Sequence, residues 1–116
     1  MNILKLCYYL SIKYLEEYLP NVPELKITNA ITYNGRTYKS IKTNIVHTIA
    51  LSKHNLYISP SFIEEEDVNC IIETICHELA HVLHFNHSKK HEELTKTFYK
   101  IVNTCLKLDS IDLLAC

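Results

Sequence analysis

The sequence predicts an α+β fold in which helices pack on one face of a small antiparallel sheet of three to four strands. Two observations support this class. Helical periodicity occupies residues 3–19 and most of residues 66–108, whereas the segment between them consists of short alternating runs separated by turn residues. Strands that follow one another without intervening helices usually pair into an antiparallel sheet, which leaves the helices to cover one face.

Length and charge restrict the class of protein. The chain has 116 residues, of which 47% are hydrophobic, and carries a formal net charge of −1. This is enough for one modest core, so we expect a single domain over residues 1–116. No run of Lys or Arg is longer than Lys89-Lys90. Strong binding to a nucleic-acid backbone is therefore not expected.

Residues 3–19 have the pattern of an amphipathic helix that ends before Pro20, because proline cannot continue a helix. Charged residues such as Lys5 and Lys13 interrupt its apolar run, and no small-residue cleavage site follows. Neither a signal peptide nor a membrane-spanning helix is expected. The five cysteines are scattered, without a C-x-x-C pair, which is typical of reduced thiols. We therefore expect a cytoplasmic protein without membrane contact.

The middle of the chain has the signals of strands. Residues 27–33 and 36–41 flank Asn34-Gly35, and this dipeptide between alternating runs is a strong hairpin signal. We therefore expect these two strands to pair with each other. Residues 45–51 alternate as a third strand, and after a short polar turn residues 56–59 form a fourth.

The most informative stretch lies in a predicted helix over residues 66–85, which reads His-Glu-Leu-Ala-His at positions 77–81. Histidines four residues apart lie one turn above each other, so His77 and His81 can place two imidazole nitrogens on one Zn²⁺. Glu78 lies beside the first ligand, where its carboxylate can accept a proton from water that the metal has made acidic. Apolar residues form a stripe on the other side of this helix, which predicts one buried face and one open face.

A catalytic zinc usually has three protein ligands and a water. A third histidine on the same straight helix, such as His84, gives poor tetrahedral geometry. His87 follows Asn86, a plausible helix stop, and a turn there can bring the imidazole back to the metal. We prefer His87 as the third ligand, and His91 and Glu92 remain alternatives.

The last helix is predicted over residues 89–108, with Ser88 as its N-cap. Asp109-Ser110 interrupts the helical pattern, and an apolar tail follows over residues 111–116. Two roles are open for this tail. It completes the core, or it folds back over the metal site and holds the site latent.

Residues 58–62, the acidic stretch after them and the motif through Lys90 resemble the SprT-like, YgjP-like and WLM group of small zinc metallopeptidases. The run Asn-His-Ser-Lys at 86–89 looks closest to the YgjP-like form. The resemblance covers roughly residues 56–98 and implies zinc at His77, His81 and His87, with Glu78 as general base. Two features differ from the group. His91 stands where an aromatic residue usually follows, and no zinc ribbon or other DNA-binding appendage is recognisable.

These observations predict a zinc-dependent metallopeptidase that cleaves a protein or peptide substrate by Glu78-assisted attack of a metal-bound water. Two alternatives are kept. The first is an ImmA/IrrE-like peptidase that cleaves a repressor, in which a downstream acid such as Glu92 or Glu93 is the third ligand. The second is a non-enzymatic interaction domain in which a closed, four-ligand zinc is a structural staple.

Overall fold

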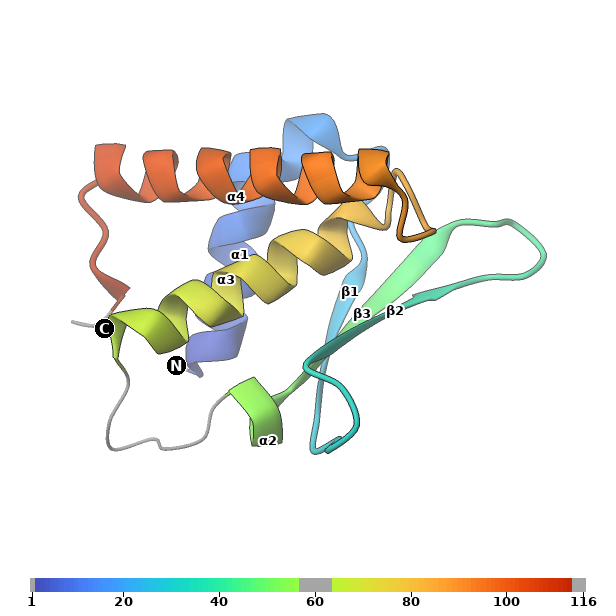
Figure 1. Ribbon diagram of the computed structural model, residues 1–116, viewed down its shortest axis with the longest axis horizontal. Helices are drawn as coiled ribbons and strands as arrows, with labels where there is room; N and C mark the ends of the chain where they lie inside the picture. The colour runs from blue at the N-terminus through green and yellow to red at the C-terminus, as the bar shows by residue number, and fades with distance from the viewer. Residues whose placement is uncertain (1, 57–63, 114–116) are drawn as a thin grey trace.

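The computed structural model describes residues 2–56 and 64–113 and has the predicted α+β class (Figure 1). The elements in chain order are α1 (Ile3–Leu15), the 3-10 turn η1 (Glu16–Tyr18), β1 (Glu24–Thr28), β2 (Gly35–Lys39), β3 (Val46–Ser52), α2 (Lys53–Leu56), α3 (Glu65–Ala80) and α4 (Lys89–Leu108). Within the described ranges, no helix combines the length and the hydropathy that crossing a bilayer requires.

The sheet is mixed, and the prediction of a purely antiparallel sheet was wrong. The strand order is β1-β3-β2, with β3 parallel to β1 and antiparallel to β2. β1 and β2 therefore lie on opposite sides of β3 and do not form the hairpin predicted at Asn34-Gly35. The strand predicted over 45–51 is confirmed as β3.

The loop between β1 and β2 explains why the hairpin signal failed. Gly35 does not have the positive φ that a tight Asn-Gly hairpin turn requires. Instead, the loop crosses the end of β3, where Ser52 donates from its backbone nitrogen to the Asn34 carbonyl and from its hydroxyl to the Ala30 carbonyl. The Asn55 amide donates to the Tyr33 carbonyl at 2.8 Å. These bonds give partners to three carbonyl groups of the loop, and they hold the loop against the end of β3 as it passes from β1 to β2.

The segment after β3 also differs from the prediction. The turn predicted before the fourth strand is the single helical turn α2, which includes Leu56. The remainder of the strand predicted over 56–59 lies outside the described residues. α3 begins at Glu65. Its N-cap is Glu64, whose backbone nitrogen donates to the Asp67 carboxylate at 3.0 Å in a capping box.

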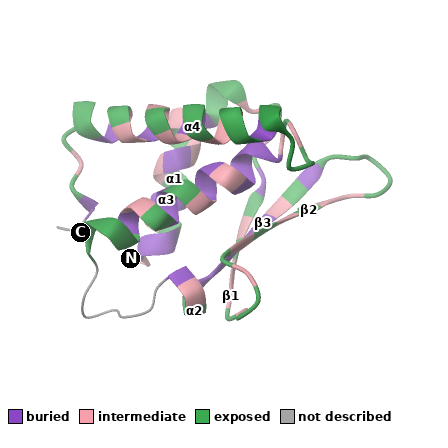
Figure 2. Cartoon of the chain, in the orientation of Figure 1, coloured by how far each residue is buried: buried purple, intermediate pink, exposed green. Residues whose placement is uncertain are grey.

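α3 is the central element of the molecule. It contacts α1 and α4 as well as β2 and β3 (Figure 1), and its buried face runs along most of its length (Figure 2). Ile71, Ile75 and Leu79 are fully buried there, together with Phe98 and Val102 from α4. The exposed residues of the sheet, such as Lys26 and Arg36, alternate with residues that face the helices.

The described part of the C-terminal tail completes the core. Leu113 is buried and belongs to the same hydrophobic cluster as Val68 and Leu106. Leu113 lines a cavity together with Glu65 and Val68, at the N-terminal end of α3, whereas the histidine motif lies at the C-terminal end of this helix. The described tail is therefore remote from the motif, which favours the core-completing role.

Candidate metal centre

Four histidines meet where α3 gives way to α4. α3 ends at Ala80, with His81 as its C-cap, and the helix predicted to reach residue 85 is therefore too long. Residues 81–83 tighten into a turn in which His81, Val82 and Leu83 donate to carbonyls three residues earlier. Ser88 then caps α4 by accepting from the His91 backbone nitrogen at 3.2 Å, as predicted.

This reversal brings His87 and His91 beside His77 and His81. Every pair among these four imidazoles has ring centroids between 4.0 and 5.3 Å apart. Ligand atoms of His77, His81 and His91 lie within 4.8 Å of one another, so these three can hold a metal ion. The predicted third ligand, His87, is not part of this group of three, although its Nε2 lies 3.2 Å from Nε2 of His77.

Two hydrogen bonds define which nitrogen of the ring carries the proton. Nδ1 of His81 is 3.2 Å from the His84 carbonyl oxygen, and Nε2 of His91 is 2.9 Å from the His77 carbonyl oxygen. A carbonyl oxygen only accepts, so each of these nitrogens is the N–H donor. The lone pair therefore lies on Nε2 of His81 and on Nδ1 of His91. A donor bond of this kind is typical of the second nitrogen of a metal-binding histidine.

The orientation of the rings differs between the two candidate third ligands. The rings of His81 and His91 stack at 4.0 Å with an interplanar angle of 22°. Because a metal lies in the plane of an imidazole that binds it, an ion in the plane of one stacked ring lies off the plane of the other. The rings of His77 and His87 are also nearly parallel, at 28°, but they face each other through their Nε2 atoms.

The site favours neutral histidines. Burial lowers the pKa of His77, of His91 and of His81, the last to about 4, and the neighbouring imidazoles lower these pKa values further. The backbone hydrogen bonds of His81 and His91 act in the opposite direction. Neutral imidazole is the form that binds a metal.

Glu78 is buried at the edge of this cluster. Its Oε1 accepts a hydrogen bond of 2.8 Å from the Thr37 hydroxyl on β2, and its Oε2 lies 3.8 Å from Nε2 of His77. Burial raises the pKa of Glu78 to about 6, although the bond from Thr37 opposes that rise. A carboxylate with this pKa can exchange a proton near neutral pH.

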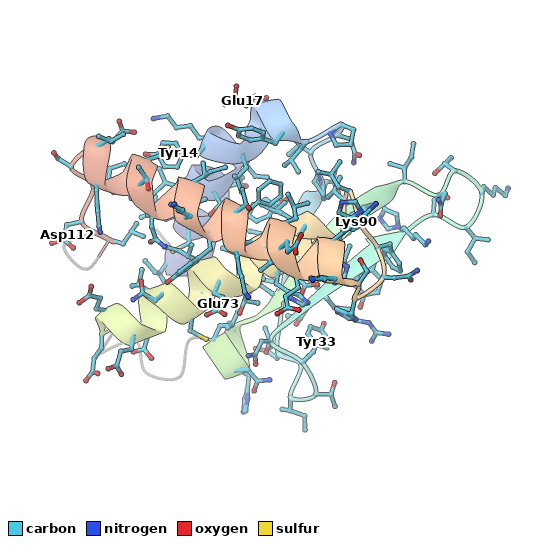
Figure 3. The ribbon with its side chains drawn as sticks, turned by 45° about the horizontal axis from the view of Figure 1, so that its top comes forward. Tyr14, Glu17, Tyr33, Glu73, Lys90 and Asp112 are labelled. Atoms are coloured by element: carbon cyan, nitrogen blue, oxygen red, sulfur yellow. The ribbon has the colours of Figure 1, made fainter. Side chains whose placement is uncertain are left out.

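A groove passes over this carboxylate. A cavity of about 340 Å³ is lined by β2 residues 35–37, by the motif and by Phe85 and His87. A second cavity of about 420 Å³ shares Gly35, His77 and Glu78 with the first and continues along α3 to Cys70. Figure 3 shows Glu73 on α3 beside this region, with Tyr33 in the loop before β2 and Lys90 at the start of α4.

The model of the SprT-like family matches residues 10–112, which is most of the chain. The chain belongs to the SprT-like family. The resemblance predicted from the motif is confirmed at this level, and the match extends well beyond the predicted residues 56–98. No curated protein and no solved structure matches the chain significantly. Membership in the SprT-like family supports a zinc-metallopeptidase-like fold.

Sequence reasoning located most of the site in this SprT-like chain but missed Thr37. The predicted residues His77, Glu78, His81 and His87 lie together, and so does the alternative His91. The other alternative, Glu92, is exposed and pairs with Lys96 at 3.5 Å. Alternation along β2 could have placed the Thr37 side chain toward the helices. Its pairing with Glu78 depends on the position of β2 in the sheet, which the hairpin signal predicted wrongly.

Proposed function

We propose that this SprT-like protein is a zinc-dependent metallopeptidase in which His77, His81 and His87 bind Zn²⁺ and Glu78 is the general base. One observation carries the proposal. The buried Glu78 carboxylate places Oε2 3.8 Å from Nε2 of a metal-binding histidine, while its other oxygen is held by Thr37. A structural zinc has no need of a buried carboxylate beside its ligands, whereas hydrolysis needs a proton acceptor there.

Ring geometry supports His87 as the third ligand. Zn–N bonds of about 2.0–2.1 Å in a tetrahedral site place ligand nitrogens about 3.3 to 3.4 Å apart. The Nε2 atoms of His77 and His87 face each other at 3.2 Å, close to that separation. His91 also lies within ligand distance, but its ring stacks on that of His81, so an ion in the plane of one ring lies off the plane of the other.

The residues of the site have separate tasks in the proposed reaction. Zinc, when bound, supplies a Lewis acid that polarises a peptide carbonyl and acidifies a water. Glu78 would accept the proton of the attacking water at Oε2 and return it to the leaving amine, while Thr37 holds Oε1. The neutral imidazoles leave the ion with most of its charge.

The position of β2 supports an extended peptide or protein as the substrate. Among the described strands, ordered β1-β3-β2, β2 pairs along one edge only, and residues 35–37 of this strand line the groove. An extended chain can add to such an edge through main-chain hydrogen bonds, which places its scissile carbonyl over Glu78. The near-zero net charge makes nucleic acid a poor ligand. The free cysteines among the described residues suit a cytoplasmic location.

One alternative function has a specific observation in its favour. His91 lies within ligand distance of His77 and His81, so rotation of its ring would close the site with a fourth nitrogen, as in a structural zinc. The ImmA/IrrE-like alternative has less support, because Glu92 and Glu93 are exposed on α4.

The decisive experiment combines metal analysis with proteolysis. The purified protein should bind about one zinc per chain, and the zinc-loaded form should cleave an unfolded protein such as denatured casein. Glu78→Gln should keep the fold and the zinc but lose cleavage by at least about 100-fold, because an amide cannot accept the proton of water.

Two further variants complete this experiment. His87→Ala should lose most of its zinc affinity, while the control Glu16→Gln, an exposed acid in η1, should behave as wild type. Full cleavage by Glu78→Gln would rule out the general-base role. Loss of zinc in His91→Ala but not in His87→Ala would show that His91, and not His87, is the third ligand.

A further inference from the structure

The two oxygens of the Glu78 carboxylate have different neighbours. Oε1 accepts from the Thr37 hydroxyl at 2.8 Å, and Oε2 lies 3.8 Å from Nε2 of His77. The side chain of Glu78 is only 7% exposed, so water competes little with these contacts. One oxygen is therefore occupied by the protein, and the other is presented to the metal-binding nitrogens.

Thr37 is well suited to hold a carboxylate in one orientation. An ionised carboxylate has no proton to donate, so the hydroxyl must be the donor. The hydroxyl also lies 3.3 Å from the Glu78 carbonyl oxygen, but the shorter contact to a charged group is the stronger bond. Because threonine is β-branched, its χ1 angle is restricted and the hydroxyl has little freedom to turn away.

Gly35 brings β2 close enough for this bond to form. A Cβ at Gly35 would lie 2.9 Å from Cγ of Glu78 and 2.9 Å from Cγ2 of Thr74. Gly35 and Thr37 are two residues apart on one strand and therefore face the same side. The strand backbone at Gly35 therefore lies close to Cγ of Glu78, while Thr37 binds the carboxylate of the same side chain.

We propose, on the basis of the peptidase function proposed above, that Thr37 is a positioning residue for the general base. Its hydroxyl holds Oε1 of Glu78 so that Oε2 points to the water that zinc activates. Without this bond the carboxylate can rotate within its pocket, and the fraction of molecules with Oε2 in the productive orientation falls. Thr37 touches neither the substrate nor the metal in this role, so it acts only through Glu78.

Thr37→Val tests this role, because valine keeps the shape of the side chain and removes the hydroxyl. We expect kcat to fall about 10- to 100-fold, as for loss of one hydrogen bond to a charged group, with KM and the zinc dissociation constant within about threefold of wild type. Thr37→Ser, which restores the donor, should recover most of the loss. Thr104→Val, an exposed change on α4, is the matched control.

Three results would overturn the role. They are an unchanged kcat in Thr37→Val, equal losses in the valine and serine variants, and a zinc affinity that falls in parallel with kcat. If Thr37→Val does not fold, Thr37→Ala takes its place, with Thr37→Ser again as the rescue. A folded alanine variant with unchanged kcat would overturn the role in the same way.

A binding measurement separates this inference from the proposed function. A hydroxamic acid binds zinc and gives its proton to a neighbouring carboxylate, so its affinity reports the position of Glu78 without turnover. We expect Thr37→Val to weaken hydroxamate binding about tenfold and Thr37→Ser to restore it. If wild type binds the hydroxamate but cleaves no substrate, the peptidase function fails while the role of Thr37 stands or falls with these affinities. If wild type binds no zinc, both fail.

Discussion

At the residue scale, His91 is the side chain that most distinguishes this site. The resemblance to small zinc metallopeptidases leads one to expect an aromatic residue at this position. His91 is 2% exposed, stacks on the ring of His81 and donates to the His77 carbonyl. It therefore contacts both candidate metal ligands of α3, and its flat ring is a shape that an aromatic residue would also supply.

A substitution of His91 by phenylalanine should be tolerated by the metal site. Phenylalanine keeps the stack on His81 and leaves the His77 carbonyl without its donor, which costs roughly 1 kcal/mol of unfolding free energy. His91→Ala should cost more, about 2 to 3 kcal/mol, because it also leaves a cavity. Zinc affinity, measured by competition with a chelator, should stay near wild type in the phenylalanine variant. A fall as large as that in His87→Ala would make His91 a ligand.

At the element scale, the sequence signals for α3 and α4 were reliable, whereas the local Asn34-Gly35 hairpin signal and the sheet order inferred from it were not. α3 and α4 could be predicted because their periodicity and caps lie within the elements themselves, as at Ser88. The motif on α3 located three of the site residues for the same reason. The sheet order could not be predicted, because the bonds from Ser52 and Asn55 that lead the chain across β3 join residues distant in sequence.

The close packing of β2 on α3 requires a residue without a side chain at position 35. In Gly35→Ala the new Cβ would meet Glu78 and Thr74 at 2.9 Å, so β2 or α3 must move. We expect a loss of about 1 to 3 kcal/mol of unfolding free energy, measured by urea denaturation, together with lower activity. Adding Thr74→Ala removes one of the two contacts and should recover part of the stability, but not the activity. A fully stable Gly35→Ala would show that β2 does not pack so closely on Glu78.

At the scale of the whole molecule, one helix contributes to both the core and the candidate metal site. The buried face of α3 contributes Ile71, Ile75 and Leu79 to the core, and its C-terminal turn contributes His77 and His81 to the site. Four imidazoles, from α3, the turn after it and α4, crowd together at this end. Zinc binding and folding should therefore be coupled, because the bound ion stabilises only the folded arrangement.

The pH dependence of stability in the zinc-free protein is the reference for this coupling. The pKa values of His77, His81 and His91 lie below 6.5 in the folded protein, that of His81 at about 4. Between pH 6.5 and about 4 the unfolded chain therefore binds protons that the folded zinc-free protein does not, and stability falls as the pH falls. Glu78 acts in the opposite direction. Because its pKa is raised to about 6 in the folded protein, the folded state takes up this proton at a higher pH than the unfolded chain does, which stabilises the folded state on acidification. Three histidines outweigh one carboxyl, so the net expectation is a loss of unfolding free energy on acidification.

Bound zinc should make the unfolding free energy fall more steeply as the pH falls. At neutral pH, zinc at about a thousand times its dissociation constant should add about 4 kcal/mol of unfolding free energy. Protons compete with the ion for the same nitrogens, so most of this gain should disappear as the pH falls toward the pKa of His81, about 4. His87→Ala should lose the gain at every pH, whereas His47→Ala, an exposed histidine on β3, should keep it. Urea unfolding at several pH values, with and without zinc, measures all of these quantities. A zinc-dependent gain that His87→Ala retains in full would mean that His87 does not bind the ion.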